Sequence, residues 1–447
     1  MHRRFGDFYR FGAIGFGDSN DIFRNAYVIT DPNEMLKVVR DQGAYPSGAI
    51  QSQWAPIRWH KERGFSMTEH ENGLFGQGEE WKRLRAFLQT DLLSPASAKS
   101  YIPGLVEAAH LASKGAPASG DDMNNFLNYC FFDLFSTVMF GELTDVADKS
   151  TPTDLDNVEF VTGALDGLSA AIEMAMSPYQ TIMCKNLGLE TARYKFMAAS
   201  YDKAWSVWQK KSRSFVQSYE KGQLTDHQKT SYLGCALVRQ SASENDITMK
   251  EMLELCFVAL FAAVDTSSSV MAWNLLHIVA NPNVQDQLHD ELRSHVGSDG
   301  KLPPAAFEPS KLPYLYAVLR ETHRLTPAAP LSLRKKLKND MEIHGVHLPS
   351  NSVVALDSFS LGMDPSFVDE PDKFMPERWF PQAVEERKGT AAEILDHPFY
   401  KDPFGQGARR CPGSRVASTE IAVLLAQMVL DWKISARPSI TSWDEMD

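Results

Sequence analysis

The sequence Phe404-Gly-Gln-Gly-Ala-Arg-Arg-Cys-Pro-Gly413 decides how the rest of the chain is interpreted. Its glycines allow tight turns and let the backbone approach a bulky, flat partner. The residues after Pro412 are apolar almost all round, which predicts a buried helix. The unpaired N–H groups and partial positive charge at the start of that helix would face the Cys411 sulfur and favour its thiolate form. The stretch therefore predicts a loop that presents one anionic, shielded sulfur.

A single shielded sulfur has two interpretations. A lone cysteine beside a Gly-rich turn can be a buried structural residue. It can also bind a metal, and one thiolate without partner cysteines suits haem iron better than zinc or an iron–sulfur cluster. The pattern F-x-x-G-x-R-x-C-x-G fixes five positions, and its chance occurrence in 447 residues is on the order of 10⁻⁴. The spacing therefore favours a metal ligand at Cys411.

At these residues the chain resembles the cytochrome P-450 family of haem-thiolate monooxygenases. The resemblance makes Cys411 the axial ligand of the haem iron, with haem b (heme b, iron protoporphyrin IX) as cofactor and O2 as co-substrate. It places Phe404 against the thiolate and Arg409 beside a haem propionate. Gly407 and Gly413 belong to the same cofactor-binding loop. The implied fold is mainly α with a small β region (α+β), in which one long central helix lies over the haem.

The composition restricts the class of protein. The chain of 447 residues has a formal charge of −12 and a sequence pI of about 5.5, so a generally basic surface for nucleic acid is not expected. Its five cysteines lie far apart and form no C-x-x-C pair, which is typical of reduced, intracellular thiols. The resemblance implies a single catalytic domain over residues 1–447.

Both ends of the chain bear on its localisation. No apolar run reaches the roughly 18–20 residues of a membrane span, and Met1 opens no signal-peptide pattern. The first residues resemble the family's first globular segment, which normally follows an anchor or a transit peptide. Relatives usually continue beyond the position of Trp432 through a C-terminal hairpin. We therefore expect an intracellular, membrane-associated protein of mitochondria or the endoplasmic reticulum, with its targeting segment missing here and its C-terminal hairpin missing or shortened.

The first half of the chain gives a coarse order of elements. Tyr27-Val-Ile-Thr30 is the clearest predicted strand, and Asp31-Pro32 supplies the cap and first residue of a helix. Residues 42–78 lack periodicity, which predicts a long functional loop, and in the family this region roofs the substrate pocket. Residues 104–245 indicate successive helices. Within them, residues 172–208 fall where the family has a mobile lid.

Trp81 and Arg85 lie at positions i and i+4 of a predicted helix over Glu79–Leu93, so they share one face. A half-buried tryptophan beside a solvated arginine is the simpler explanation. The family has W-x-x-x-R at this place, and the resemblance implies that both residues bind a haem propionate. With Cys411 in the chain, the second interpretation is favoured.

The predicted central helix begins at a capping box, Thr248-Met-Lys-Glu251, and contains Ala262-Ala-Val-Asp-Thr-Ser-Ser-Ser269. An acid and four hydroxyls inside an apolar helix are costly unless they are satisfied, and a solvated stripe is the alternative. The run resembles the family's oxygen-activating motif, except that Ala263 replaces a glycine. The resemblance implies that the Thr266 hydroxyl holds water and the bound oxygen, while Asp265 relays protons.

A charge network is expected around Glu321 and Arg324, which lie at i and i+3 of one helix. Such pairs are common on exposed helices, but this one resembles the family's buried E-x-x-R, with Arg378 as the third partner. A buried network survives only if every member is paired, and its implied role is structural. Arg334 stands where the family has another propionate-binding arginine; a solvated charge is the alternative.

The resemblance implies an oxidoreductase that inserts one oxygen atom of O2 into a lipophilic substrate such as a sterol or fatty acid. Its electrons would come from a ferredoxin or a flavoprotein reductase, and peripheral membrane contact is expected. Basic residues expected near the proximal face suit an acidic electron donor: Lys82, Arg409, Arg410 and Arg415. Two alternatives remain open: a haem-thiolate isomerase or dehydratase that needs no electrons, and a non-catalytic haem-binding protein.

Within the family, the chain most resembles the mitochondrial, ferredoxin-coupled clan. The matching stretches are Tyr45-Pro-Ser, Trp54, Arg58, Gly73-Leu, Gly78-Glu-Glu-Trp81 and Leu92-Leu-Ser-Pro95. In that clan the helix with E-x-x-R carries two basic docking residues. Arg320 matches one of them, whereas Tyr316 stands at the other position.

Overall fold

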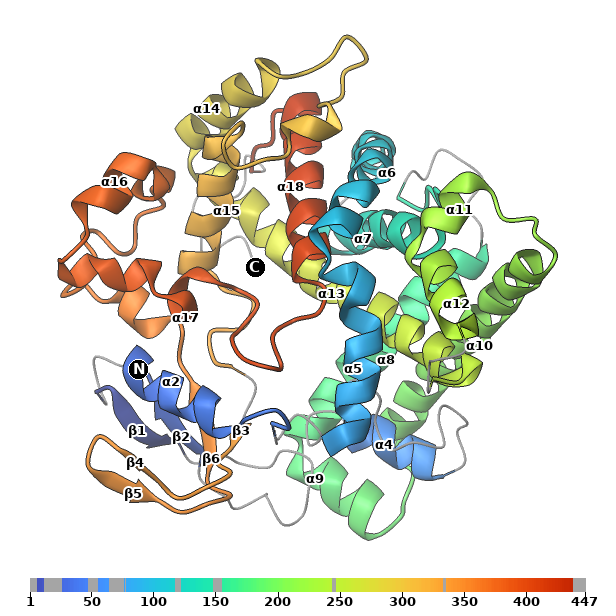
Figure 1. The fold of residues 1–447 in the computed structure, drawn as a ribbon, viewed down its shortest axis with the longest axis horizontal. Coiled ribbons are helices and arrows are strands. Elements are labelled where there is room, and N and C mark those ends of the chain that lie inside the picture. The colour runs from blue at the N-terminus through green and yellow to red at the C-terminus, as the bar shows by residue number, and fades with distance from the viewer. Residues whose placement is uncertain are drawn as a thin grey trace.

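The computed structural model shows a mainly helical molecule with a small β region at one side, seen at the lower left of Figure 1. It describes residues 6–11, 26–46, 55–63, 76, 78–116, 122–147, 155–242, 247–332 and 335–436. The predicted fold class, mainly α with a small β region, is confirmed.

The helices of the first half, in chain order, are α2 (Pro32–Asp41), α4 (Ala55–Glu62), α5 (Gly78–Leu92), α6 (Pro95–Lys114), α7 (Met123–Phe140), α8 (Leu155–Met176), α9 (Pro178–Gln180), the π-helix η3 (Thr181–Asn186), α10 (Ala192–Glu220), α11 (Asp226–Thr230) and α12 (Tyr232–Ser241). Those of the second half are α13 (Met249–Ala280), α14 (Pro282–Arg293), α15 (Pro313–Leu325), α16 (Pro381–Glu386), α17 (Pro398–Lys401) and α18 (Ser414–Asp431). Short 3-10 turns complete them: η4 (Pro304–Ala306), η5 (Ser360–Met363), η6 (Pro376–Trp379) and η7 (Ala391–Asp396).

The β region joins the N-terminal segment of the described chain to residues 335–356. Its strands are β1 (Phe8–Phe11), β2 (Ala26–Ile29), β3 (Lys335–Lys336), β4 (Met341–Ile343), β5 (Val346–Leu348) and β6 (Val353–Leu356). One sheet has the order β1-β2-β6-β3, and β4 and β5 form a separate hairpin. β2 pairs in parallel with β6, and β3 pairs with β6 in the antiparallel sense. The strand predicted at Tyr27–Thr30 is therefore confirmed as β2, one residue earlier.

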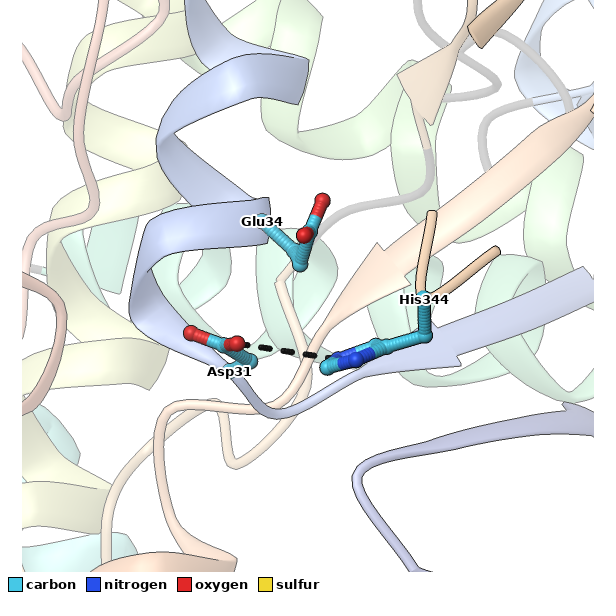
Figure 2. Close-up of side chains that lie close together, drawn as sticks. All are labelled: Asp31, Glu34 and His344. Carbon is cyan, nitrogen blue, oxygen red and sulfur yellow. Dashed lines mark ion pairs between the residues drawn. The ribbon is translucent and has the colours of Figure 1, made fainter. Parts of the chain in front are cut away.

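Helix α2 begins as predicted and is held to the β4–β5 hairpin. The Asp31 side chain accepts a hydrogen bond from the backbone N–H of Asn33 at 2.8 Å, and proline occupies the first helical turn. Figure 2 shows that Asp31 also faces His344 at the hairpin turn, where their side chains form an ion pair at 3.7 Å. This contact links the start of the helix to the hairpin.

The core of the molecule is built around α13. A capping box at Thr248 and Glu251 starts the helix as predicted, and its 32 residues correspond to about 48 Å. α13 packs against α7, α15 and α18. Among the described helices, α13 alone has the length and apolar composition of a membrane span, but 53% of its most apolar window is buried inside the fold, as in the core helix of a soluble protein.

The region expected to be a continuous loop contains a helix. α4 occupies Ala55–Glu62, within residues 42–78, where the sequence analysis predicts a loop. Its Trp59 is 2% exposed and packs with Met174 of α8 and with Tyr194 and Met197 of α10. Packing against distant helices therefore stabilises a helix that the local sequence does not predict.

Candidate functional site

The Cys411 loop, residues 402–413 between α17 and α18, is closed on itself by a hydrogen bond from the Cys411 backbone N–H to the carbonyl of Phe404, at 3.0 Å. Gly405 and Gly407 have φ angles of +75° and +85°, which side-chain-bearing residues rarely adopt. A Cβ atom on Gly407 would lie 2.7 Å from a methyl group of Val39 in α2. The glycines thus permit both the turn and its close approach to α2.

The electrostatic surroundings of Cys411 fit a metal ligand. Burial raises the pKa of its thiol, while the backbone N–H of Gly413 and the charges of Arg85 and Arg410 act in the opposite direction. The predicted helix N-terminus and neighbouring cations are therefore present, yet burial outweighs them and leaves the thiol protonated at neutral pH. A metal ion deprotonates a coordinating thiol, so this buried sulfur suits coordination better than service as a free nucleophile.

Trp81, Arg85 and Arg409 come together as the sequence predicted. The guanidinium of Arg409 lies 4.3 Å from the centre of the Trp81 ring. Arg85 donates to Gln89 at 3.1 Å and to the carbonyl of Arg410. Trp81 and Arg85 are 3% and 8% exposed, so the alternative of a solvated arginine is wrong.

Arg409 is surrounded by neutral acceptors. It donates to the carbonyl of Pro46 at 3.0 and 3.1 Å and to that of Gly76 at 2.6 Å. Burial and the nearby charge of Arg85 lower its pKa to about 10. Among the described residues neither the buried Arg85 nor the half-buried Arg409 has a carboxylate partner, so the two charges call for an anion. The propionates of haem would supply one, and these residues fit that group.

The contacts of Arg410 that stabilise the Cys411 loop internally were not predicted from the sequence. Arg410 forms an ion pair with Asp402 at 2.9 Å and donates to the Ser414 hydroxyl at 2.6 Å. Its guanidinium also lies 5.9 Å from the centre of the Phe404 ring. Asp402 lies before the first residue of the motif, and nothing in the local pattern distinguishes it from a surface acid.

The polar run of α13 splits into buried and open positions. Ser267 and Ser268 are 2% and 1% exposed, and Ser268 donates to Asn128 of α7 at 2.5 Å. Thr266 and Ser269 are exposed on another face, which excludes a single solvated stripe. The Thr266 hydroxyl donates to the carbonyl of Ala262 at 2.9 Å, as expected for a hydroxyl in a helix.

Asp265 lies in the same run, half-buried beside Thr266, and burial raises the pKa of its carboxyl. A group that gains a proton more readily than a solvated carboxylate is suited to proton transfer near neutral pH. α13 packs against α18, the helix that begins directly after the Cys411 loop. The open face of α13 and the loop therefore belong to neighbouring elements.

The predicted charge network is present and buried. Glu321, which is 0% exposed, pairs with Arg324 at 2.7 Å and with Arg378 at 3.3 Å. It also accepts hydrogen bonds from the indole of Trp379 at 2.9 Å and from the backbone N–H of Met375 at 3.0 Å. The paired acid therefore ties α15 to the segment around η6.

Arg334 and Lys335 are two further basic residues to consider near the site. Arg334, predicted to bind a propionate, lies outside the described residues. Its neighbour Lys335, in a run of basic residues that would ordinarily be solvated, lies in β3 with 8% exposure. Burial and the charge of Arg409 lower the pKa of Lys335 to about 8. Lys335 thus belongs beside the Arg409 cluster.

One other group of side chains approaches metal-binding geometry. Ligand atoms of Asp31, Glu34 and His344 lie within 4.8 Å of one another (Figure 2). Asp31 is already engaged as the cap of α2, and Glu34 pairs with Lys37 at 2.7 Å. These contacts explain the cluster as a structural link without a metal.

Comparison with known proteins now identifies the family. The family model "Cytochrome P450" matches residues 19–446, so the chain belongs to the cytochrome P450 family. It is 30% identical to the mitochondrial sterol 26-hydroxylase of Mus musculus, over 90% of this chain and 73% of the relative. It is 26% identical to the mitochondrial 25-hydroxyvitamin D-1 alpha hydroxylase of Homo sapiens, over 96% of this chain and 82% of the relative.

A third relative is the mitochondrial cholesterol side-chain cleavage enzyme of Mesocricetus auratus, which is 23% identical over 96% of this chain and 78% of its own length. The predicted resemblance to mitochondrial cytochromes P450 is thus confirmed. As a member of this family, the protein is a haem-thiolate monooxygenase that uses haem b and O2.

Proposed function

We propose that residues 1–447 form one catalytic domain that inserts an oxygen atom of O2 into a lipophilic, sterol-like substrate, with electrons from a ferredoxin or a flavoprotein reductase. The observation that carries this proposal is the meeting of two elements: the Cys411 loop opens α18, and α18 packs against α13, whose exposed face carries Thr266. The names of the three relatives, which refer to a sterol, to vitamin D and to cholesterol, support the substrate class.

The residues of the site would have two kinds of role, cofactor binding and proton transfer. Cys411 would hold the haem iron, and Arg85, Arg409 and Trp81 would hold the propionate edge; the Phe404 ring would shield the sulfur. When bound, haem supplies the oxygen-activating chemistry, which a thiolate ligand promotes. The Thr266 Oγ1 would hold a water by a hydrogen bond, and Asp265 would carry protons to that position from solvent.

The first test is the spectrum of the reduced protein with carbon monoxide. We expect the red-shifted Soret band of thiolate-bound haem for the parent chain, and its loss in Cys411→Ser. A parent protein that binds haem but lacks this band would overturn the assignment of Cys411.

The second test separates a monooxygenase from an isomerase or a binding protein. With a reconstituted electron donor and a sterol, Thr266→Ala should form less hydroxylated product and release more hydrogen peroxide, because the proton-holding hydroxyl is lost. Ser269→Ala, one turn away on the same exposed face, is the matched control and should behave as the parent. Equal product and peroxide from the Thr266 and Ser269 variants would contradict the proposed role of Thr266.

We propose that the electron donor docks on basic residues around the Cys411 loop. Arg409 and Arg410 are committed to contacts within the site, so the expected basic surface is reduced to Lys82 and Arg415, both exposed. Arg320 is exposed as well, with its guanidinium 5.8 Å from the centre of the Trp379 ring. Lys82→Glu, Arg415→Glu and Arg320→Glu should each slow reduction by a ferredoxin, and the loss should shrink as salt is added.

We also propose that the protein is a mitochondrial enzyme, as the names of its relatives suggest, and that it associates with a membrane. Large apolar side chains are exposed along the stretch from the end of α8 to the start of α10: Ile172, Tyr179, Ile182, Leu187, Leu189 and Phe196. Such a concentration is typical of membrane or protein contact. Replacing Leu187 and Leu189 by serine should weaken sedimentation with phospholipid vesicles, and unchanged sedimentation would contradict this surface.

A further inference from the structure

Two buried cations, Arg85 and Lys335, and the half-buried Arg409 lie beside the Cys411 loop. Arg85 comes from α5, Arg409 from the loop itself and Lys335 from β3, and Lys335 is 8% exposed. The charge of Arg85 acts on Arg409, and that of Arg409 acts on Lys335. Elements far apart in the sequence therefore bring like charges into one shielded space.

Lys335 is the least compensated of the three. Arg85 and Arg409 donate to carbonyl and amide oxygens, whereas the Lys335 ammonium has no ion pair and no hydrogen-bond partner among the described residues. Its backbone is fixed, because Lys335 pairs with Val354 of the wholly buried strand β6. Lys335 is only 8% exposed, so its ammonium is less hydrated than that of a lysine on a rim.

A buried ammonium without a partner, next to a guanidinium, is unfavourable unless an anion joins them. The nearest described acid that the loop offers, Asp402, is already paired with Arg410 at 2.9 Å. The pKa of Lys335, lowered to about 8 by burial and by Arg409, reflects the same imbalance. The space therefore lacks a negative charge that a bound carboxylate would bring.

We propose that Lys335 is a third cationic anchor for the haem, whose carboxylates it binds together with Arg85 and Arg409. The sequence pattern of the family did not indicate this residue, which stands next to the predicted Arg334. The proposal rests on the assignment of Cys411 as the haem ligand. It makes Lys335 a positioning residue that fixes how firmly the cofactor is held.

The test is the rate at which purified holoprotein loses haem to an excess of apomyoglobin. Lys335→Met keeps the length and apolar stem of the side chain and removes its charge. It should lose haem about tenfold faster than the parent, because a contact to a charged group is removed. Lys335→Arg should restore most of the retention. Lys338→Met, at an exposed lysine three residues along the chain, is the control and should match the parent.

A second measurement assigns the effect to the carboxylates. Proteins reconstituted with haem dimethyl ester, which has no free propionates, should lose it at the same rate whether residue 335 is lysine or methionine. Equal loss of ordinary haem from the Lys335→Met and Lys338→Met proteins would overturn the proposal, as would an undiminished difference with the diester. The reduced carbon-monoxide spectrum of each variant tests Cys411 separately, so failure of one assignment is distinguishable from failure of the other.

Discussion

At the scale of single residues, the site is defined by groups that cannot be replaced without creating an unpaired charge or a clash. Glu321 has two arginines, an indole and a backbone N–H as partners. A Cβ atom on Gly407 would lie only 2.7 Å from a methyl group of Val39. Each residue fixes a segment next to the Cys411 loop, so each permits a sharp test.

Replacing Glu321 by alanine should destabilise the protein by about 3–5 kcal/mol, because Arg324 and Arg378 are left buried without their counter-ion. Urea unfolding of the haem-loaded protein measures this loss. Asp286→Asn is the control, because it removes an exposed pair with Lys433 at 3.1 Å and should cost less than about 1 kcal/mol. Similar losses in the two variants would contradict a stabilising role for the buried network.

Gly407→Ala should be more destabilising than Gly405→Ala. Both substitutions place a Cβ on a left-handed backbone, at a cost of about 1–2 kcal/mol. Only at residue 407 does the new atom meet Val39, at 2.7 Å, whereas residue 405 opens to free space. Adding Val39→Ala should recover part of the stability of Gly407→Ala and none of that of Gly405→Ala. Thermal unfolding and haem content of these single and double variants check this expectation.

At the scale of elements, α18 and α13 show how buried helices carry polar groups. Glu420 of α18 is 0% exposed, and neither of its carboxylate oxygens has a hydrogen-bond partner among the described residues. Burial raises its pKa from 4.5 to about 8. On α13, by contrast, buried Ser268 is satisfied by Asn128 of α7 and by its own helix. Of these two buried residues, only Glu420 changes its charge with pH.

The Glu420 carboxyl should make the protein less stable as pH rises. Between about pH 4.5 and 8 the unfolded chain releases this proton while the folded chain keeps it, so unfolding becomes more favourable. Glu420→Gln removes the titration, and it should be more stable than the parent by roughly 4 kcal/mol at pH 8 and equal to it near pH 4. Denaturant midpoints across this range measure the effect. Glu79→Gln, at an exposed residue of α5, should show no such trend.

At the scale of the whole molecule, the β region and the helical core meet near the Cys411 loop. The Tyr400 hydroxyl, in α17 just before the loop, lies 2.8 Å from the carbonyl of Thr30 and 3.0 Å from that of Asp357. Thr30 follows β2 and Asp357 follows β6, so one side chain joins the loop to both central strands. Figure 1 shows the segment after α17 running from the β side of the molecule toward α18.

Tyr400→Phe should lower stability by about 1–3 kcal/mol, because two buried carbonyls lose a donor. Tyr179→Phe, at a residue that is 59% exposed, is the control and should be neutral. Limited proteolysis should cut the Tyr400→Phe protein faster at the β region than at the helices. Unchanged unfolding and cleavage would show that the two regions are joined mainly through other contacts.

Much of the fold and of the candidate site could be predicted because it depends on short sequence patterns. The Cys411 loop, the capping box of α13 and the Glu321–Arg324 pair each depend on spacing within one segment, and the structure shows all three. Helix α4 and the burial of Lys335 depend instead on partners far along the chain, which no local pattern contains. The same holds for Asp402, whose importance comes from its contact with Arg410.

The parallel pairing of β2 with β6 has a consequence for biosynthesis. Residues 26–29 leave the ribosome more than three hundred residues before their partners at 353–356, so the edge of β2 that faces β6 stays open through most of translation, while its other edge can pair with β1. The helices from α5 to α14 are complete earlier and can collapse first, while non-local strand pairing is slow. The nascent chain therefore exposes one open strand edge to chaperones for most of its synthesis, and haem can be bound only after the segment that carries Cys411 has emerged.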